Sequence, residues 1–185
     1  MLQIHQFLEI QDALERYREA RHLSFENQQR GFIGNLYEEI AEFARASNDF
    51  EAVGELCDIV VFIFNAFEFE YIHKKFLNCV ARHDRAFDLI SLLIDTYTDK
   101  NLDIVVLKED LDSSKAPHMN CIMAICDFIE SLGFHFYLCM KETIKKIESR
   151  SGKYDTKLKK FVKDTSPKAK AKWYEPDFSK CRLRA

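Results

Sequence analysis

Glycine and proline are scarce in this chain, which has five glycines and three prolines among 185 residues. Turn-rich architectures need many more of both residues. Apolar residues instead recur at helical spacing through most of the first 150 positions, and no solenoid-type repeat is present. The chain is therefore predicted to be a nearly all-helical bundle.

Several signals of other environments are also missing. The six cysteines form no CxxC pair, no cationic start leads into an apolar signal segment, and no uncharged stretch reaches the roughly 18 residues of a membrane span. We therefore expect a cytoplasmic protein without membrane contact. Five cysteines lie on apolar stretches and are predicted to be small buried hydrophobes. These are Cys57, Cys79, Cys121, Cys126 and Cys139.

Charge is distributed unevenly, although the net charge is only −3. Residues 151–185 carry eleven Lys or Arg against four Asp or Glu, which leaves residues 1–150 at about −10. We expect one all-α domain over residues 1–150. Residues 151–185 are expected to form a basic, mostly irregular tail that packs on this domain or extends from it.

The apolar spacing and the turn residues give the expected helix bounds. We expect helices at about residues 10–22, 27–46, 50–70 and 73–95, and a helical region at 119–150 that breaks near Gly133. Asp49 is the expected N-cap of the third helix. The short Asn48-Asp49 turn predicts that the second and third helices form a hairpin.

Four carboxylates on this hairpin carry the chemical signal. They form two pairs with helical spacing, Glu39-x-x-Glu42 and Glu55-x-x-Asp58. Residues three apart share a helix face, so the two pairs can converge. Such a cluster repels itself unless cations neutralise it, and ligands that are all oxygen favour hard ions such as Mg²⁺.

The simplest alternative is a solvated acidic stripe. Against it, the residues after Asp58 (59–64) are apolar on every side of the helix, which predicts a buried helix and a partly desolvated carboxylate. No Lys or Arg lies between Asp49 and Tyr71. A metal ion or a basic group from a distant part of the chain must therefore compensate this charge.

This pattern resembles the all-α nucleoside triphosphate pyrophosphohydrolases, which include MazG-like proteins, dimeric dUTPases, dCTP pyrophosphatases and phosphoribosyl-ATP pyrophosphohydrolase. Their signature is ExxE, a gap, and then ExxD, and here twelve residues separate Glu42 from Glu55. The doubled acid Glu38-Glu39 is similar to the MazG pattern, and residues 141–152 are similar to the C-terminal end of MazG-like proteins. Many relatives have an Asn near Ile144, where this chain has none.

The resemblance implies a four-helix MazG-like core that releases a nucleoside monophosphate and pyrophosphate from a nucleoside triphosphate. It implies Mg²⁺, with Mn²⁺ as a possible substitute, on Glu39, Glu42, Glu55 and Asp58. Relatives assemble as dimers or tetramers, so a homodimer or homotetramer is expected. Five further residues are candidates: Glu38 as the catalytic group that orients or deprotonates water, and Asn35, Lys141, Lys145 and Arg150 as substrate-binding groups.

Three alternatives stay open. The His83-Asp84 pair is typical of a different class of metal-dependent phosphohydrolases, and Glu70-x-x-His73 is one half of a di-iron motif. A non-enzymatic helical protein could instead bind a partner or nucleic acid through the basic tail, where lysines mix with Trp173 and Tyr174. In the enzyme interpretation we do not expect nucleic acid as a partner, because a charged terminal segment is usually solvated or docked on its own acidic body. The tail could then fold over the acidic site and supply positive charge.

Overall fold

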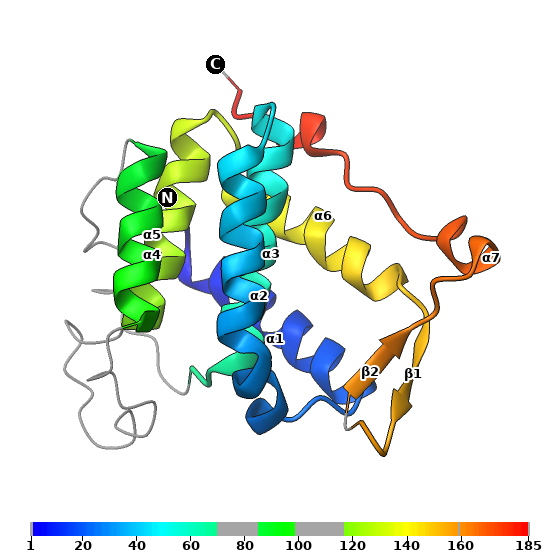
Figure 1. Ribbon diagram of the computed structural model, residues 1–185. Helices are drawn as coiled ribbons and strands as arrows, with labels where there is room; N and C mark the ends of the chain where they lie inside the picture. The colour runs from blue at the N-terminus through cyan, green and yellow to red at the C-terminus, as the bar shows by residue number, and fades with distance from the viewer. Residues whose placement is uncertain (1, 70–84, 99–116, 159, 185) are drawn as a thin grey trace.

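The computed structural model describes residues 2–69, 85–98, 117–158 and 160–184 as a bundle of helices with a small hairpin at one edge (Figure 1). The predicted all-α class is confirmed. The elements are α1 (Ile4–Ala20), α2 (Phe25–Arg45), α3 (Asp49–Ala66), α4 (Ala86–Thr98), α5 (Pro117–Ser131), α6 (Phe136–Ser149), β1 (Gly152–Asp155), β2 (Lys160–Lys163), α7 (Pro167–Lys170) and the 3₁₀ helix η4 (Phe178–Cys181). No helix among the described residues is long and apolar enough to cross a bilayer.

Helices α2 and α3 form the predicted hairpin. The link is short because α3 begins directly after Asn48, whose side-chain oxygen accepts the backbone N–H groups of Phe50 and Glu51. The expected cap, Asp49, is wrong by one residue: Asn48 has the extended backbone that a cap needs, and Asp49 is already helical. The tight turn fixes how the two helices face each other.

Helix α3 lies at the centre of the bundle and packs against α1, α2, α5, α6 and η4. Of the apolar run after Asp58, only Phe62 is partly exposed, so the predicted burial of this helix is correct. The expected burial of the cysteines holds for Cys57, Cys121, Cys126 and Cys139, whereas Cys79 lies outside the described residues. The second acid pair, Glu55 and Asp58, therefore lies on the central, buried helix of the bundle.

The predicted break near Gly133 separates α5 from α6. Gly133 has a φ of +83°, a left-handed conformation that glycine adopts without steric cost. The expected helix at 73–95 corresponds in part to α4, because residues 70–84 lie outside the described part of the chain. The break turns α6 back across α3 and brings Lys146 to the α2–α3 hairpin.

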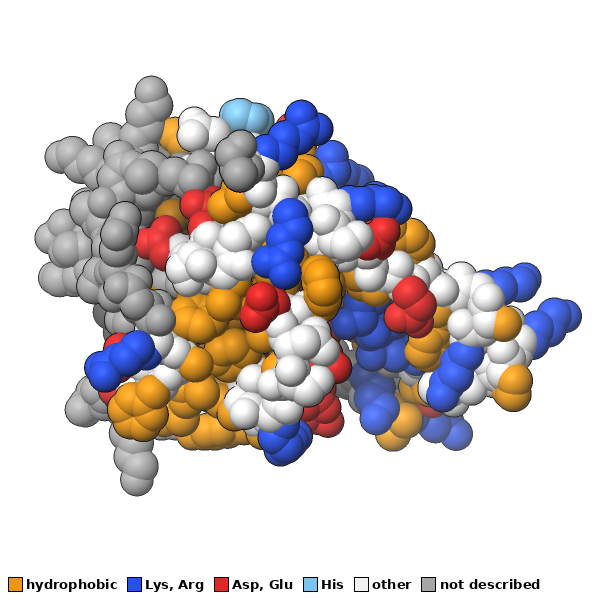
Figure 2. Space-filling model, turned by 90° about the horizontal axis from the view of Figure 1, so that it is seen from above, with side chains coloured by type: hydrophobic (Ala, Val, Ile, Leu, Met, Phe, Trp, Pro, Cys, Tyr) orange, Lys and Arg blue, Asp and Glu red, His pale blue; other side chains and the backbone are white. Residues whose placement is uncertain are grey.

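The C-terminal segment has more regular structure than the sequence indicated. Strands β1 and β2 pair antiparallel, and Figure 2 shows Lys and Arg side chains on the projecting lobe that carries α7. Two aromatic residues attach the hairpin: the Tyr154 ring lies 5.8 Å from the His22 ring, and the Arg21 guanidinium lies over Phe161. A Cβ atom at Gly152 would lie 2.3 Å from the Val162 carbonyl oxygen, so this pairing requires glycine there.

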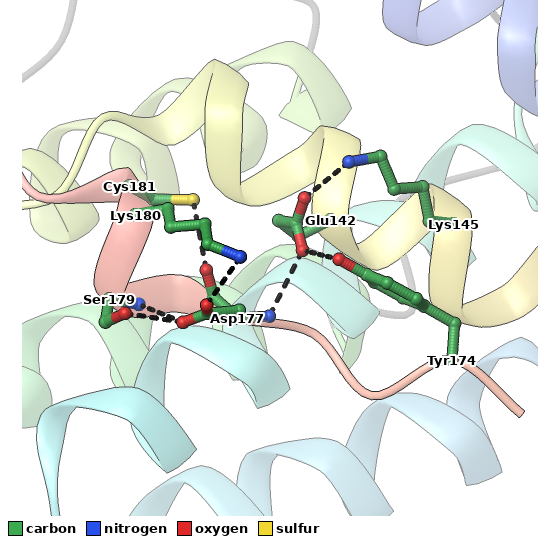
Figure 3. A network of polar contacts seen from close by, with 7 residues as sticks. All are labelled: Glu142, Lys145, Tyr174, Asp177, Ser179, Lys180 and Cys181. Carbon is green, nitrogen blue, oxygen red and sulfur yellow. Dashed lines mark hydrogen bonds and ion pairs between the residues drawn. The ribbon is translucent and has the colours of Figure 1, made fainter.

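After α7 the chain runs back along α6, fastened by the buried carboxylate of Glu142 (Figure 3). This carboxylate accepts hydrogen bonds from the Tyr174 hydroxyl, the Asp177 backbone N–H (3.1 Å) and the Lys145 ammonium (2.6 Å). Farther along, the Cys181 carbonyl accepts the His135 N–H at 2.7 Å. These contacts join residues 174–181 to α6 and to the residue before it.

Candidate functional site

Three of the four predicted carboxylates meet at the α2–α3 seam. Oxygens of Glu39 and Glu42 from α2 and of Glu55 from α3 all lie within 4.8 Å of one another. Glu39 and Glu55 are half-buried and Glu42 is exposed. The tight turn at Asn48 produces this convergence, because it places the second turn from the end of each helix side by side.

The fourth carboxylate, Asp58, lies one turn beyond Glu55 and has a different partner. The ammonium of Lys146 on α6 lies 2.6 Å from Asp58, and both side chains are mostly buried. Asp58 still belongs to the same electrostatic site, since its charge raises the pKa of Glu39 and of Glu55. Thus a distant basic group compensates Asp58. In the described part of the chain, no Lys or Arg nitrogen lies within 4.0 Å of the other three acids.

The acid cluster is electrostatically strained. Burial, a hydrogen bond to Glu55 and the charges of the neighbouring acids raise the pKa of Glu39 to about 8. Burial likewise raises the pKa of Glu55, against the opposing effect of its hydrogen bond with Glu39. Near neutral pH a proton is therefore held between these two carboxylates, at a position where a cation would also relieve the repulsion.

This raised pKa predicts a pH-dependent stability. A proton on Glu39 contributes stability that is complete below the ordinary pKa of 4.5 and is lost as pH rises through about 8. We expect the free energy of unfolding of the metal-free protein to fall over this range. Saturating Mg²⁺ should flatten the fall, because the ion replaces the proton. Urea unfolding at a series of pH values, with and without Mg²⁺, measures both effects; identical curves would contradict this assignment.

Two further cations lie beside Lys146. Arg150 is the C-cap residue of α6, four residues after Lys146, and Lys163 is the last residue of β2. Partial desolvation and the charge of Arg150 lower the pKa of Lys163, whereas Asp58 and Glu39 act in the opposite direction. The Lys163 side chain nevertheless remains exposed. The C-terminal hairpin thus contributes a positive charge to the edge of the acid cluster.

Two predicted substrate-binding residues, Lys141 and Lys145, lie elsewhere. They line a cleft of about 380 Å³ between α1 and α6. Lys145 pairs with Glu142, and the Lys141 ammonium lies 5.2 Å from the centre of the Tyr137 ring. The structure does not bring either lysine to the carboxylates, because successive helical residues are rotated by about 100° and Lys146 takes that face.

The remaining predicted residues surround the cluster. Arg150 lies over the Trp173 ring at 5.6 Å. Asn35 is half-buried one turn before Glu39, and Glu38 is exposed beside it. The residues of two alternative sites, His83-Asp84 and Glu70-x-x-His73, lie outside the described residues.

Sequence reasoning missed Lys146 and Lys163. Lys146 lies three residues after the fully buried Thr143, so the core-facing side of α6 was a usable signal for it. For Lys163 the signal was alternation with Phe161, which turns its side chain to the same face of β2. Recognising that signal required knowing that residues 152–163 form a hairpin.

Comparisons with known proteins give no family assignment: no family model matches the chain, and no curated protein or solved structure matches it. The interpretation of the site therefore depends on its own residues and on the resemblance of its motif. Those residues form an acidic centre with a row of cations along one side.

Proposed function

We propose that this protein is a Mg²⁺-dependent nucleoside triphosphate pyrophosphohydrolase that releases a nucleoside monophosphate and pyrophosphate. The observation that carries the proposal is the convergence of Glu39, Glu42 and Glu55, with Asp58 one turn away. The resemblance of the ExxE and ExxD motifs to the all-α pyrophosphohydrolases agrees with it. A nucleotide carries the phosphate oxygens that an acidic metal centre bordered by cations can bind.

The four side chains suit a hard divalent ion. Every donor is a carboxylate oxygen, the preferred ligand of Mg²⁺, and Mn²⁺ accepts the same donors. The raised pKa of Glu39 means that the cluster lacks positive charge at neutral pH. Its proton and the Lys146 ammonium at Asp58 are the groups that an ion would displace. When bound, the ion would neutralise phosphate charge and lower the pKa of a bound water.

The protein's own groups have distinct roles in this proposal. Lys146, Arg150 and Lys163 hold the phosphate oxygens and compensate charge that increases on them during hydrolysis. The Glu38 carboxylate accepts a proton from the attacking water. The Asn35 amide hydrogen-bonds the sugar or base. Positioning and electrostatics, without a covalent protein intermediate, supply the rate enhancement.

We further propose a homodimer or homotetramer in the cytoplasm. Ile33 and Tyr37, one turn apart on the outer side of α2, are 38% and 42% exposed. A second copy that covers this side would remove both side chains from water. Sedimentation of the intact chain with an Ile33→Ser, Tyr37→Ser variant as comparison tests the assembly.

A substrate panel tests the activity. The purified chain is incubated with Mg²⁺ and each common ribo- and deoxyribonucleoside triphosphate, and products are separated by ion-exchange chromatography. We expect monophosphate and pyrophosphate in equal amounts, with activity lost on chelation and restored by Mg²⁺ or Mn²⁺. Release of inorganic phosphate alone, or no hydrolysis of any nucleotide, would contradict the proposal.

A further inference from the structure

The outward face of the C-terminal hairpin and α7 is strongly basic. Residues 150–172 contain nine Lys or Arg against two Asp, an excess of seven positive charges. The rest of the chain has a net charge of about −10. A basic segment in an acidic protein can dock on the acidic surface or extend into solvent, and the sequence leaves both arrangements open.

The strand register shows which side chains of the hairpin face the body of the protein. Tyr154, Phe161 and Lys163 face the body of the protein, towards His22, Arg21 and the acid cluster respectively. The cross-strand pairs Lys153–Val162 and Asp155–Lys160 alternate with these residues. Because side chains alternate along a strand, these pairs face outward. The hairpin thus turns Lys163 towards the body and presents Lys153 and Lys160 to solvent.

The two acids of this segment do not neutralise the lysines. The Asp155 carboxylate accepts the backbone N–H groups of Lys157 and Leu158, and the Asp164 carboxylate accepts that of Ser166. Both acids thereby shape the turns. The outward lysines are all exposed, and none of them forms an ion pair within the described residues: Lys153, Lys157, Lys160, Lys168, Lys170 and Lys172.

These lysines are held in place by the fold. Ala169 is buried, which anchors α7 between Lys168 and Lys170. Trp173 lies near the Arg150 guanidinium and the Lys170 ammonium, both within 6.0 Å of its ring centre, so its ring is already in contact with cations. The surface therefore presents exposed cations on a folded backbone, without a free aromatic platform among the described residues.

We infer that this outward surface binds the sugar-phosphate backbone of nucleic acid without reading its bases. Evenly spaced phosphates match a row of separate cations, and release of counterions favours the complex. The expectation that nucleic acid is not a partner is revised, because these lysines lie on a folded surface and do not dock on the acidic body. An anionic membrane suits the surface less well, since only Leu158 and Val162 are exposed apolar residues on the hairpin.

Fluorescence anisotropy with labelled single strands and duplexes tests the inference. We expect binding that does not depend on base sequence and weakens steeply between about 0.05 and 0.2 M salt. The variant Lys153→Gln, Lys160→Gln, Lys168→Gln should bind at least about 10-fold more weakly and have a shallower salt dependence. The matched control neutralises Arg16, Arg30 and Arg85, which are exposed on α1, α2 and before α4, and should bind as the parent does.

Nucleotide hydrolysis should be the same in both triple variants, because neither alters the acid cluster or its cations. The inference is overturned if the parent does not bind at low salt, or if the lysine variant binds as tightly as the control. Binding to vesicles of phosphatidylcholine and phosphatidylserine without binding to nucleic acid also overturns it, in favour of a membrane contact. A chain that binds nucleic acid but hydrolyses no nucleotide would leave this inference standing and remove the proposed activity.

Discussion

Glu39→Gln should abolish hydrolysis while making the metal-free protein more stable in alkaline solution. We expect kcat to fall about 10²- to 10³-fold, because the substitution removes a proposed metal ligand and its charge. Stability should change in the opposite direction. The amide cannot ionise, so the burial and the neighbouring charges that raise the pKa of Glu39 to about 8 no longer oppose folding above that pH. Steady-state kinetics and urea unfolding of the same preparation measure both effects.

A structural role and a catalytic role predict different outcomes for this variant. Glu19→Gln, an exposed acid on α1, is the matched control and should change neither quantity. If Glu39 were only a solvated surface acid, its variant would behave like the control. A variant that loses both activity and stability would mean that Glu39 supports the fold, and it would contradict the proposed role of Glu39 as a metal ligand.

The second large effect is expected from Glu142→Ala. This substitution removes the carboxylate that accepts hydrogen bonds from Tyr174, Asp177 and Lys145. The segment after α7 then loses its charged hydrogen-bond acceptor on α6. We expect the melting temperature to fall by about 5 to 10 °C, from the loss of hydrogen bonds to a buried charged group. Trypsin should also cleave the lysines of residues 153–172 sooner than in the parent.

Differential scanning calorimetry and timed proteolysis with mass spectrometry measure this release. Glu148→Ala, an exposed acid on the same helix, controls for loss of charge and helix propensity. Tyr174→Phe removes one of the three hydrogen bonds and should have an intermediate effect. An unchanged melting temperature and cleavage pattern in Glu142→Ala would mean that Phe178 and Cys181, the buried side chains of η4, are sufficient to hold the segment.

Much of the bundle could be predicted because local rules decide it. The apolar face of α2 and the burial of α3 after Asp58 follow from residue spacing, and the turn at Asn48 follows from the short polar link. The N-cap was placed one residue late, because Asn and Asp are comparable caps and only the backbone conformation distinguishes them. The convergence of the acids needed only these elements, so the sequence was sufficient to expect it.

The cations were harder to predict because they depend on tertiary packing. Whether Lys145 or Lys146 faces Asp58 depends on the rotation of α6, which is set by the burial of Cys139, Thr143 and Ile147. Lys163 depends on a hairpin whose strands have four residues each. Strands of that length have a weak sequence signal. That Tyr154 and Phe161 face the body of the protein is known only from their contacts with His22 and Arg21.

Manganese binding at the α2–α3 seam is the most direct test of the proposed metal centre. Crystals of the chain soaked in Mn²⁺ can be measured at a wavelength where manganese scatters anomalously. We predict an anomalous peak coordinated by Glu39, Glu42 and Glu55, with Asp58 released from Lys146. Two results would contradict the proposed centre. One is a peak only at the other group of possible ligands, which is Cys126, Asp127 and Glu130 on α5. The other is no peak in a crystal whose packing leaves the α2–α3 seam open to solvent.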